Sequence, residues 1–354
     1  MRVLFLESAD SWTGGARAFF AAGRTLAARS HAVAFACPSG SALERHAAAA
    51  AIPVYSVDEE RLRPRARATR SAIEAHFADV VFAQDTEAHL AAALAVRRTA
   101  HTALVRRVPA GAVFPSDRRT RWAERTAPAA YLVTAPTGGA DTIPKLPTLN
   151  ATVGIDPPPV PPVRSSAGED PLHLACVATD DDAMPALEVL RSLRLLAERH
   201  PRCRLTMVGI ARRLDECRVL AAAMGVADRI RWVPENREGS DAFAGAALAW
   251  VLAGGDAGAF GCLDAMAHGL PVMAPRSPVF ERYVDEAAQG ALLSTLHPPE
   301  MAAVVDRLIA KPDERARASR AARARVSGEL SGLAMAASFE HAARLAQSRE
   351  RKRS

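Results

Sequence analysis

The stretch of sequence that decides the fold is residues 248–275, LAWVLAGGDAGAFGCLDAMAHGLPVMAP. It opens with an apolar run at 248–252, which predicts a buried strand, and continues into a glycine-rich loop. Residues 263–268 predict a helix that stops at Gly269, and residues 271–274 predict the next strand. A strand, a glycine-rich loop, a helix and a second strand in this order are typical of a parallel α/β sheet.

Two carboxylates stand eight positions apart in this stretch, at Asp256 and Asp264. The predicted helix places Asp264 in its first turn, where the helix dipole favours a negative charge. A carboxylate at that position can accept two hydrogen bonds from a ribose diol, and free N–H groups nearby can hold phosphate. The alternative interpretation is that Asp264 is an N-terminal helix residue and nothing more.

The same alternation of strands and helices extends over the rest of the chain. Before residue 150, strands are predicted at 2–7, 32–37, 53–57, 79–83, 102–106 and 130–133, with helices at 16–30, 41–50, 65–77 and 87–98. After residue 170, further strands are predicted at 172–178, 204–208 and 230–233, and helices at 184–199, 212–223, 299–310, 313–326 and 332–347. We therefore expect an α/β protein with parallel sheets that have helices on both faces.

A proline-rich segment, PPPVPPVR at 157–164, divides the alternation into two halves. Such a segment is a stiff, extended linker. The prediction is two Rossmann-like domains at 1–156 and 167–330, a linker at 157–166, and a C-terminal helix with a basic tail at 331–354. Two such sheets predict an interdomain cleft, because ligands bind beyond the carboxyl ends of parallel strands.

The composition is that of a soluble globular protein with an excess of arginine. Of 354 residues, 49% are hydrophobic and 24% are charged, and the net charge is +6. This charge favours anionic ligands such as nucleotide phosphates, acidic glycans or a lipid surface, although a compositional bias explains it equally well. No apolar run approaches the length of a membrane span, and no nucleic acid partner is expected.

Cysteine usage bears on the compartment and on metals. The five cysteines are scattered, form no Cys-x-x-Cys pair and have no metal-ligand spacing, which is typical of a reducing compartment. The start of the sequence lacks the pattern of a signal peptide. We expect a cytoplasmic protein, with peripheral contact at the inner face of the membrane as an alternative.

Two other segments are candidates for binding. Gly14 and Gly15 directly follow the first predicted strand, where glycines let backbone N–H groups approach an anion, although plain turn chemistry looks the same. The stretch 106–125 holds six arginines against two acids. It predicts capture of an anionic or lipid-phosphate acceptor, and the alternative is a solvated basic helix.

These features together resemble the retaining glycosyltransferases often called family 4, which adopt the two-Rossmann GT-B fold. That family has two acidic residues separated by seven others, the second in an acidic-Ala-Met-Ala-x-Gly-x-Pro-Val phrase. Here the phrase is DAMAHGLPV at 264–272, and Asp256 falls at the position of the first acid. Gly14-Gly15 resembles the family's N-terminal glycine loop, and residues 80–85 resemble its acceptor-side strand. Residues 154–156 resemble the end of its first domain, and residues 204–209 resemble its strand that ends in Val-Gly. Glu281 lies where the family often has a Glu after the Pro-Val strand.

The resemblance implies a nucleotide-diphospho-sugar donor held by the second domain, with no metal and no cofactor. Asp264 would bind the ribose hydroxyls, and Asp256 would lie near the sugar or the reacting centre. The backbone at Gly261, Cys262 and Leu263 would face the diphosphate. Other donor-binding candidates are Gly14, Gly15 and Gly209. A glycan, lipid-linked or small-molecule acceptor would be held by the first domain, near Asp85, Arg106 and Arg107.

The chain departs from the family in the loop at 178–185, ATDDDAMP, which has three acids and no base. The family usually places an Arg and a Lys there, to neutralise the leaving diphosphate. Loss of one such group costs about 3–4 kcal/mol in the transition state. Candidate substitutes are Arg191, Arg212 and Arg213. The main hypothesis is a retaining, metal-independent glycosyltransferase; the alternatives are a catalytically degenerate glycosyltransferase-like binding or scaffold protein, and a different enzyme such as a sugar epimerase.

Overall fold

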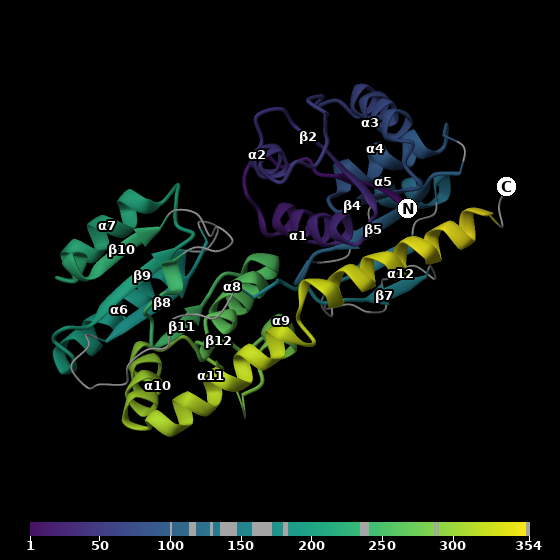
Figure 1. Cartoon of the computed structure of the whole chain (residues 1–354). Coiled ribbons are helices and arrows are strands. Elements are labelled where there is room, and N and C mark those ends of the chain that lie inside the picture. The colour runs from purple at the N-terminus through teal and green to yellow at the C-terminus, as the bar shows by residue number, and fades with distance from the viewer. Residues whose placement is uncertain are drawn as a thin grey trace. The chain divides into compact units, whose positions relative to one another are not determined.

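The computed structural model describes residues 1–99, 101–112, 118–127, 130–134, 147–157, 172–179, 183–233, 241–286, 288 and 290–351, without the side chains of 183–185 and 241. The chain divides into two compact units, one formed by Met1–Gly154 and Gly332–Ser354 and the other by Ile155–Ser331. Each unit is a parallel sheet between layers of helices (Figure 1). The predicted fold class is therefore observed in both halves of the chain.

The first unit contains a seven-stranded sheet in the order β3-β2-β1-β4-β5-β6-β7, and every neighbouring pair is parallel. Its strands are β1 (Arg2–Leu6), β2 (Ala32–Cys37), β3 (Val54–Ser56), β4 (Val80–Ala83), β5 (Ala103–Val108), β6 (Ala130–Val133) and β7 (Thr148–Asn150). Strands β1 to β6 were predicted from the sequence, whereas the short, half-exposed β7 was not.

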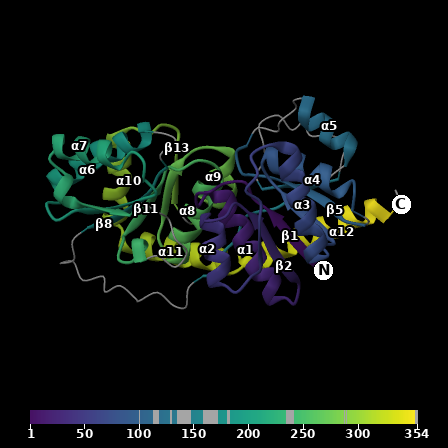
Figure 2. The ribbon, with the colours of Figure 1, turned by 90° about the horizontal axis from the view of Figure 1, so that it is seen from above.

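Two groups of helices cover this sheet (Figures 1 and 2). One group is α1 (Gly14–Ala28), α2 (Ala42–Ala49) and α12 (Gly332–Arg351), in which α1 contacts both others. The other is α3 (Leu62–His76), α4 (Thr86–Val96) and α5 (Arg118–Thr126), in which α4 contacts both others. Helices on opposite faces are what right-handed connections between parallel strands produce.

The C-terminal helix α12 packs in the first unit, although the chain enters it from the second. The ring centroid of Phe339 on α12 lies 5.0 Å from that of Phe82 on β4, and the two rings are tilted against each other. Next to it, Glu340 accepts hydrogen bonds at 2.6 Å from Nε of Arg29 and at 3.1 Å from Nε2 of His31. The first unit is therefore completed by a segment far away in the sequence, whereas the sequence predicts a separate C-terminal helix at 331–354.

The second unit contains a six-stranded parallel sheet in the order β10-β9-β8-β11-β12-β13. Its strands are β8 (His173–Val177), β9 (Arg204–Val208), β10 (Ile230–Val233), β11 (Leu248–Val251), β12 (Val272–Pro275) and β13 (Gly290–Leu293). Its α-helices are α6 (Ala183–Arg199), α7 (Leu214–Ala223), α8 (Gly255–Ala267), α9 (Pro278–Tyr283), α10 (Pro298–Ala310) and α11 (Pro312–Ser327). The strand order matches the first six strands of the first unit, so the chain repeats one topology twice.

The boundary between the units falls at Gly154–Ile155, two residues before the predicted end of the first domain at 156. Of the predicted linker 157–166, only Pro157 lies within the described residues. The predicted interdomain cleft stays a prediction.

Candidate functional site

The candidate site lies at the carboxyl edge of the second sheet, where its topology switches direction. From β8, the chain adds β9 and β10 on one side, and β11, β12 and β13 follow on the other. The carboxyl ends of β8 and β11 are thus adjacent, with a helix leaving each in turn. Ligands of open α/β sheets bind at such a switch point.

Helix α8 begins at Gly255, directly after Gly254 as its N-cap. The prediction that the helix begins near Leu263, with Asp264 in its first turn, is wrong. The glycines at 255, 258 and 261 are part of the helix rather than of a loop. Asp256 is the acid in the first turn, and Asp264 is the tenth helical residue.

The glycines inside α8 allow the helix to lie close to the sheet. A Cβ on Gly258 would stand 2.0 Å from the carbonyl oxygen of Ala253. A Cβ on Gly261 would stand 3.0 Å from the Cγ1 atoms of both Val177 and Val251, at the ends of β8 and β11. Close packing therefore outweighs the usual cost of glycine within a helix.

This placement changes the predicted roles of Gly261, Cys262 and Leu263. All three are buried within α8, where each N–H bonds the carbonyl four residues earlier. These N–H groups are consequently not available to a diphosphate, which corrects the prediction. Burial also raises the pKa of the Cys262 thiol far above its ordinary range, so this cysteine is a packing residue.

The two carboxylates are both buried, with Asp256 5% and Asp264 6% exposed. Eight residues at a rise of 1.5 Å place them about 12 Å apart along the helix axis. They cannot hold the same small group, but they can contact two ends of an extended ligand. The helix dipole supports Asp256, whereas Asp264 lies in the C-terminal half of α8, where the dipole gives no such support.

The end of β9 approaches the end of β8 through Gly209. This residue has a φ of +94°, and a Cβ there would stand 2.3 Å from the carbonyl oxygen of Ala178. Only glycine fits this backbone conformation and this approach. Gly209 thus shapes the edge of the candidate site, and its predicted contact with a donor stays a prediction.

Arg212 and Arg213 follow in the turn between Gly209 and α7, beyond the carboxyl end of β9. Arg212 is exposed, whereas Arg213 donates to Glu216 on its own helix, with Nη2 and Oε2 2.7 Å apart. The three acids of the loop at 178–185, at positions 180–182, lie outside the described residues. Whether these arginines compensate for it remains a prediction.

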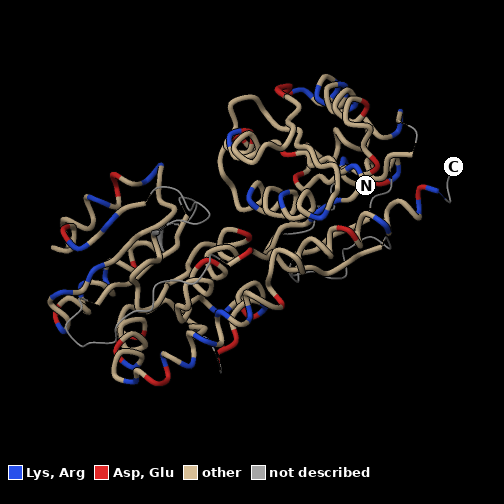
Figure 3. Tube along the Cα trace, in the orientation of Figure 1, with Lys and Arg blue, Asp and Glu red and all other residues tan. Residues whose placement is uncertain are grey.

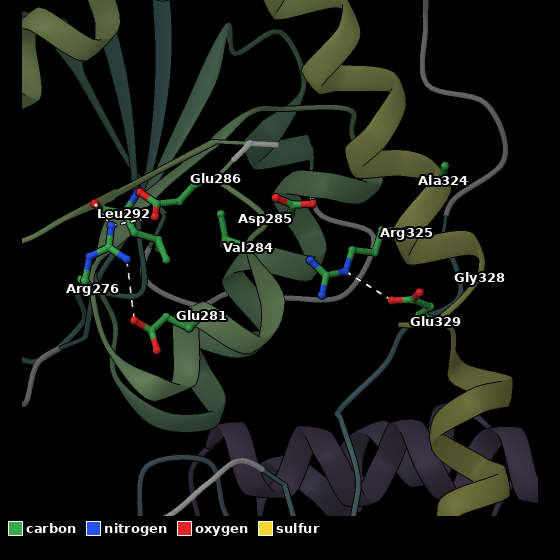
Figure 4. A pocket seen from close by; sticks show the side chains of 10 residues that line it. All are labelled: Arg276, Glu281, Val284, Asp285, Glu286, Leu292, Ala324, Arg325, Gly328 and Glu329. Carbon is green, nitrogen blue, oxygen red and sulfur yellow. Dashed lines mark hydrogen bonds and ion pairs between the residues drawn. The ribbon is translucent and has the colours of Figure 1, made fainter. Parts of the chain in front are cut away.

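A hollow of about 900 Å³ lies beyond β12, lined by residues of α9, β13 and α11 (Figure 4). Arg276, the first residue after β12, lies 2.7 Å from Glu286 and 3.7 Å from Glu281. Its hydrogen bond lowers the pKa of the Glu286 carboxyl below the ordinary value. Arg276 is a cation at the carboxyl edge that sequence analysis missed, although an Arg directly after a strand was a pattern that could have found it.

The corresponding edge of the first sheet carries a buried polar network. Nε2 of Gln84 donates to Glu7 at 2.6 Å, and Nη1 of Arg107 donates to Oε1 of Gln84 at 2.9 Å. The other oxygen of Glu7 accepts from the N–H groups of Ser8 and Ala9. Burial, aided by the charge of Asp85, raises the pKa of Glu7 to about 7.

Gly14 and Gly15 open α1 beneath this network, with Thr13 as the N-cap that accepts from Ala16 N–H. A Cβ on Gly15 would stand 1.9 Å from Nε2 of Gln84. The side chain of Gln84 therefore occupies the space that a Cβ at position 15 would take. The predicted contact of Gly14 and Gly15 with a donor stays a prediction.

Asp85 and the two arginines of β5 have internal partners. Asp85 caps α4 by accepting from Ala88 N–H at 2.8 Å and also accepts from Ser8 Oγ at 2.7 Å. Arg106 is 2% and Arg107 0% exposed, and as strand neighbours they point to opposite faces of the sheet. Both side chains are buried in a strand, so neither belongs to a solvated helix. The predicted contact of Asp85, Arg106 and Arg107 with an acceptor stays a prediction.

Arg106 lies against a histidine on the face covered by α3, α4 and α5. Its Nη1 is 3.0 Å from Nδ1 of His89 on α4. Burial, and then the charge of Arg106, lower the pKa of His89 to about 3. His89 is consequently neutral, and it was not among the residues that sequence analysis nominated.

Two negative findings apply to the part of the chain that the structure describes. It contains no group of three or more His, Cys, Asp or Glu side chains placed to hold a metal ion. Each helix within it is too short or too polar to cross a bilayer.

Comparison with known proteins agrees with this architecture. Residues 170–325 match the family model described as glycosyl transferases group 1, and no curated protein has a matching sequence. A glycosyltransferase from Rickettsia africae ESF-5 is 12% identical with a TM-score of 0.77, over 97% of this chain and 98% of that one. Anabaena HepE in complex with UDP and glucose is 15% identical with a TM-score of 0.74, over 96% and 98%.

A third similar structure is WaaG, a glycosyltransferase involved in lipopolysaccharide biosynthesis. It is 17% identical with a TM-score of 0.66, over 97% of this chain and 99% of that one. At such identities the likeness establishes the fold. The chain has the two-Rossmann GT-B fold of these glycosyltransferases, and the predicted fold class is confirmed.

Proposed function

We propose that the chain is a retaining, metal-independent glycosyltransferase that uses a nucleotide-diphospho-sugar donor. The observation that carries the proposal is the pair of buried carboxylates on α8, at the switch point of the second sheet. Both lie within the segment that matches the glycosyl transferase family model. The fold shared with HepE, which was solved with UDP-glucose, supports a donor of this chemical class.

The donor would lie along α8, with its two ends at the two carboxylates. The first N–H groups of α8 have no partner within the helix and point towards the carboxyl edge, so they suit the diphosphate. Asp256 would contact the sugar and Asp264 the ribose hydroxyls. The separation of about 12 Å along the axis suits an extended ligand of this kind.

In the reaction, the bond between the anomeric carbon and the phosphate oxygen breaks, and the acceptor oxygen bonds to that carbon. The acceptor proton passes to the leaving diphosphate on the same face of the sugar, so configuration is retained. The negative charge that develops on the diphosphate needs stabilisation. Besides the N-terminus of α8, the candidate cations are Arg191 on α6, Arg212 and Arg213 beyond β9, and Arg276 beyond β12.

The acceptor would bind the first unit at the edge where β1 and β4 are adjacent. Glu7, Gln84 and Arg107 hold this edge together and fix the segment after β1. We infer a glycan, a lipid-linked sugar or a small molecule as acceptor. The lipopolysaccharide function of WaaG supports the first two classes.

A second candidate is a glycosyltransferase-like binding protein without catalysis. The acids Asp180, Asp181 and Asp182 favour it, because they replace the bases that usually neutralise the leaving group. The two proposals predict the same donor pocket. They differ in whether a bound donor is turned over.

The test is calorimetry with UDP, GDP, ADP and their glucose conjugates, followed by an assay of donor hydrolysis. The enzyme proposal predicts binding of at least one nucleotide sugar and its slow hydrolysis. Binding without any hydrolysis or transfer supports the non-catalytic protein. If none of these compounds binds, both proposals fail.

Asp264→Ala tests the ribose contact. We expect affinity for the bound nucleotide to fall by at least about tenfold, because hydrogen bonds to a charged group are worth about 1.5–3 kcal/mol each. The matched control is Asp313→Ala, which removes an exposed carboxylate on α11 of the same unit. Equal affinities of the two variants would refute the role of Asp264.

A further test reverses the charge of Arg212 and Arg213 to Glu. If they stabilise the leaving diphosphate, turnover should fall by at least about a hundredfold. Donor affinity should fall less, since the charge develops mainly in the transition state. Unchanged turnover would leave Arg191 and Arg276 as candidates among the described cations.

A further inference from the structure

A groove of about 1170 Å³ crosses the outer helical face of the first unit, between α3, α4 and α5. Its floor is apolar and includes the buried side chains Ala66 and Leu90 and the half-buried Leu94. At one rim stands Trp122 of α5, which is 37% exposed. This face is separate from the one covered by α1 and α12 (Figure 1).

The rim of the groove is strongly basic. Seven arginines and a single acid, Glu87, line it, and Figure 3 shows basic positions along α3 and near the ends of α4 and α5. Arg119 lies 3.5 Å from Glu87, and Arg70 lies 3.5 Å from Glu74. For the guanidinium groups of the other five, the structure gives no hydrogen bond or ion pair to any described residue; they belong to Arg63, Arg67, Arg97, Arg98 and Arg118.

A cationic rim around an apolar floor suits an amphiphile with an anionic head. Guanidinium groups bind phosphate with paired hydrogen bonds. An exposed Trp beside them is the side chain that favours the interface between headgroups and acyl chains. Each basic residue near an anionic leaflet adds to the attraction, so five arginines along one rim suit a surface with many phosphates better than one small anion.

We propose that the α3–α4–α5 face of the first unit docks on a bilayer that contains anionic phospholipids. Phosphate headgroups lie over the arginine rim, and Trp122 and Leu94 face the interfacial region. The contact is peripheral, because none of the described helices can span a bilayer. Duplex nucleic acid also carries phosphates, but it offers no apolar layer to the floor of this groove.

This inference goes beyond the proposed glycosyl transfer. The groove lies on the helices of the first unit, whereas the donor site is proposed at the sheet edge of the second. The protein can therefore dock on membranes even if it binds no donor, and it can bind a donor even if it does not bind vesicles.

The experiment is flotation of the full chain with large unilamellar vesicles. One set consists of phosphatidylcholine alone. The other also contains phosphatidylglycerol, whose anionic headgroups attract basic segments. We expect the protein to float with the anionic vesicles only, and less so as salt is raised. Equal binding to both sets, or to neither, overturns the proposal.

Charge reversal locates the contact. Arg97→Glu with Arg98→Glu should lower partitioning onto anionic vesicles by at least about tenfold. The matched control is Arg317→Glu with Arg320→Glu, which makes the same change of charge at exposed positions on α11 of the second unit. Equal loss in both variants would show that net charge alone attracts the protein, and the proposal would fail.

Two further measurements address the apolar part and the rival partner. Trp122→Ala should weaken vesicle binding about threefold or more, and Trp122→Phe should restore most of it, because an aromatic ring remains at the interface. If both variants bind vesicles as strongly as the wild type does, Trp122 has no role in the contact. Duplex DNA that binds with the same dependence on Arg97 and Arg98, while vesicles do not bind, would assign the groove to nucleic acid instead.

The groove variants also keep the two proposals apart. Their affinity for the nucleotide sugar, measured by calorimetry without vesicles, should equal that of the wild type. Thermal melting of each variant checks that the first unit is folded. Loss of vesicle binding in a folded variant with intact donor affinity is the expected result.

Discussion

Replacing Glu7 by Gln should change how the stability of the first unit depends on pH. Glu7 is 3% exposed, and burial raises its pKa from the ordinary 4.5 to about 7. Between these two values the folded chain keeps the proton that the unfolded chain has released. The stability that this group contributes is therefore fully present below pH 4.5 and is lost as pH rises through 7.

The size of the effect follows from the two pKa values. One pKa unit corresponds to about 1.4 kcal/mol, so the loss between pH 5 and pH 8 is about 2.5 kcal/mol. The Gln variant cannot ionise and does not suffer this loss. Its altered hydrogen bond to Gln84 adds an offset that is the same at each pH. The stability of Glu7→Gln relative to the wild type should thus rise by about 2.5 kcal/mol over this range.

The assay is urea unfolding of the full chain at pH 5, 6, 7 and 8, followed by circular dichroism. His89 acts in the opposite direction, because its lowered pKa gives stability that is present above pH 6.5 and lost as pH falls towards 3. Wild type and variant share His89, so its contribution cancels in their difference. Glu74→Gln, at an exposed carboxyl of α3, is the control. A difference between wild type and Glu7→Gln that stays constant within about 0.5 kcal/mol would refute the reasoning.

Three other substitutions test the packing at the two sheet edges. Gly15→Ala should destabilise the first unit by about 1–3 kcal/mol, because its Cβ would displace Gln84, and an unchanged melting temperature would contradict this. Gly209→Ala should lower the free energy of unfolding by at least about 2 kcal/mol and weaken nucleotide binding, since it combines a positive φ with a clash at Ala178. A thermal melt like that of the wild type would contradict this prediction. Arg213→Ala should change stability by less than about 1 kcal/mol in the same melts, as its pair with Glu216 is at the surface.

The sequence predicted the alternation of strands and helices well, because buried parallel strands consist mostly of apolar residues. The runs at β1, β2, β4, β8 and β11 are of this kind and were found from hydrophobicity alone. The edge strands β7 and β13 are short and only partly buried; β7 has a single apolar residue, whereas β13 is apolar but only four residues long. They are recognised as strands by their parallel pairing with β6 and β12.

The start of α8 was predicted wrongly for a tertiary reason. Glycine disfavours a helix in isolation, so the segment around Gly258 and Gly261 has the composition of a loop. In the folded chain these positions face Ala253, Val177 and Val251, and any larger residue would hold the helix away from the sheet. The candidate phosphate site therefore moves from Gly261–Leu263 to the N-terminus of α8.

The arginines of the first unit illustrate the same limit. From the sequence, Arg106 and Arg107 belonged to one basic stretch with Arg118 and Arg119. The strand β5 buries the first two among internal partners, whereas α5 leaves the second pair at the rim of a groove. Local sequence gives charge, but only the three-dimensional arrangement decides whether a charge meets a ligand.

By itself, the sequence determined the α/β class, the division into two halves and the segment that carries the paired acids, since these depend on local periodicity and spacing. The tertiary structure alone decided where α8 begins, that α12 completes the first unit, and which arginines are buried. These features depend on contacts between residues far apart in the chain, such as Phe82 with Phe339, which no local pattern encodes. The stretch at 248–275 therefore predicted a donor site. The packing of its glycines against the sheet decided where α8 begins, and so which backbone N–H groups stand at the start of that helix.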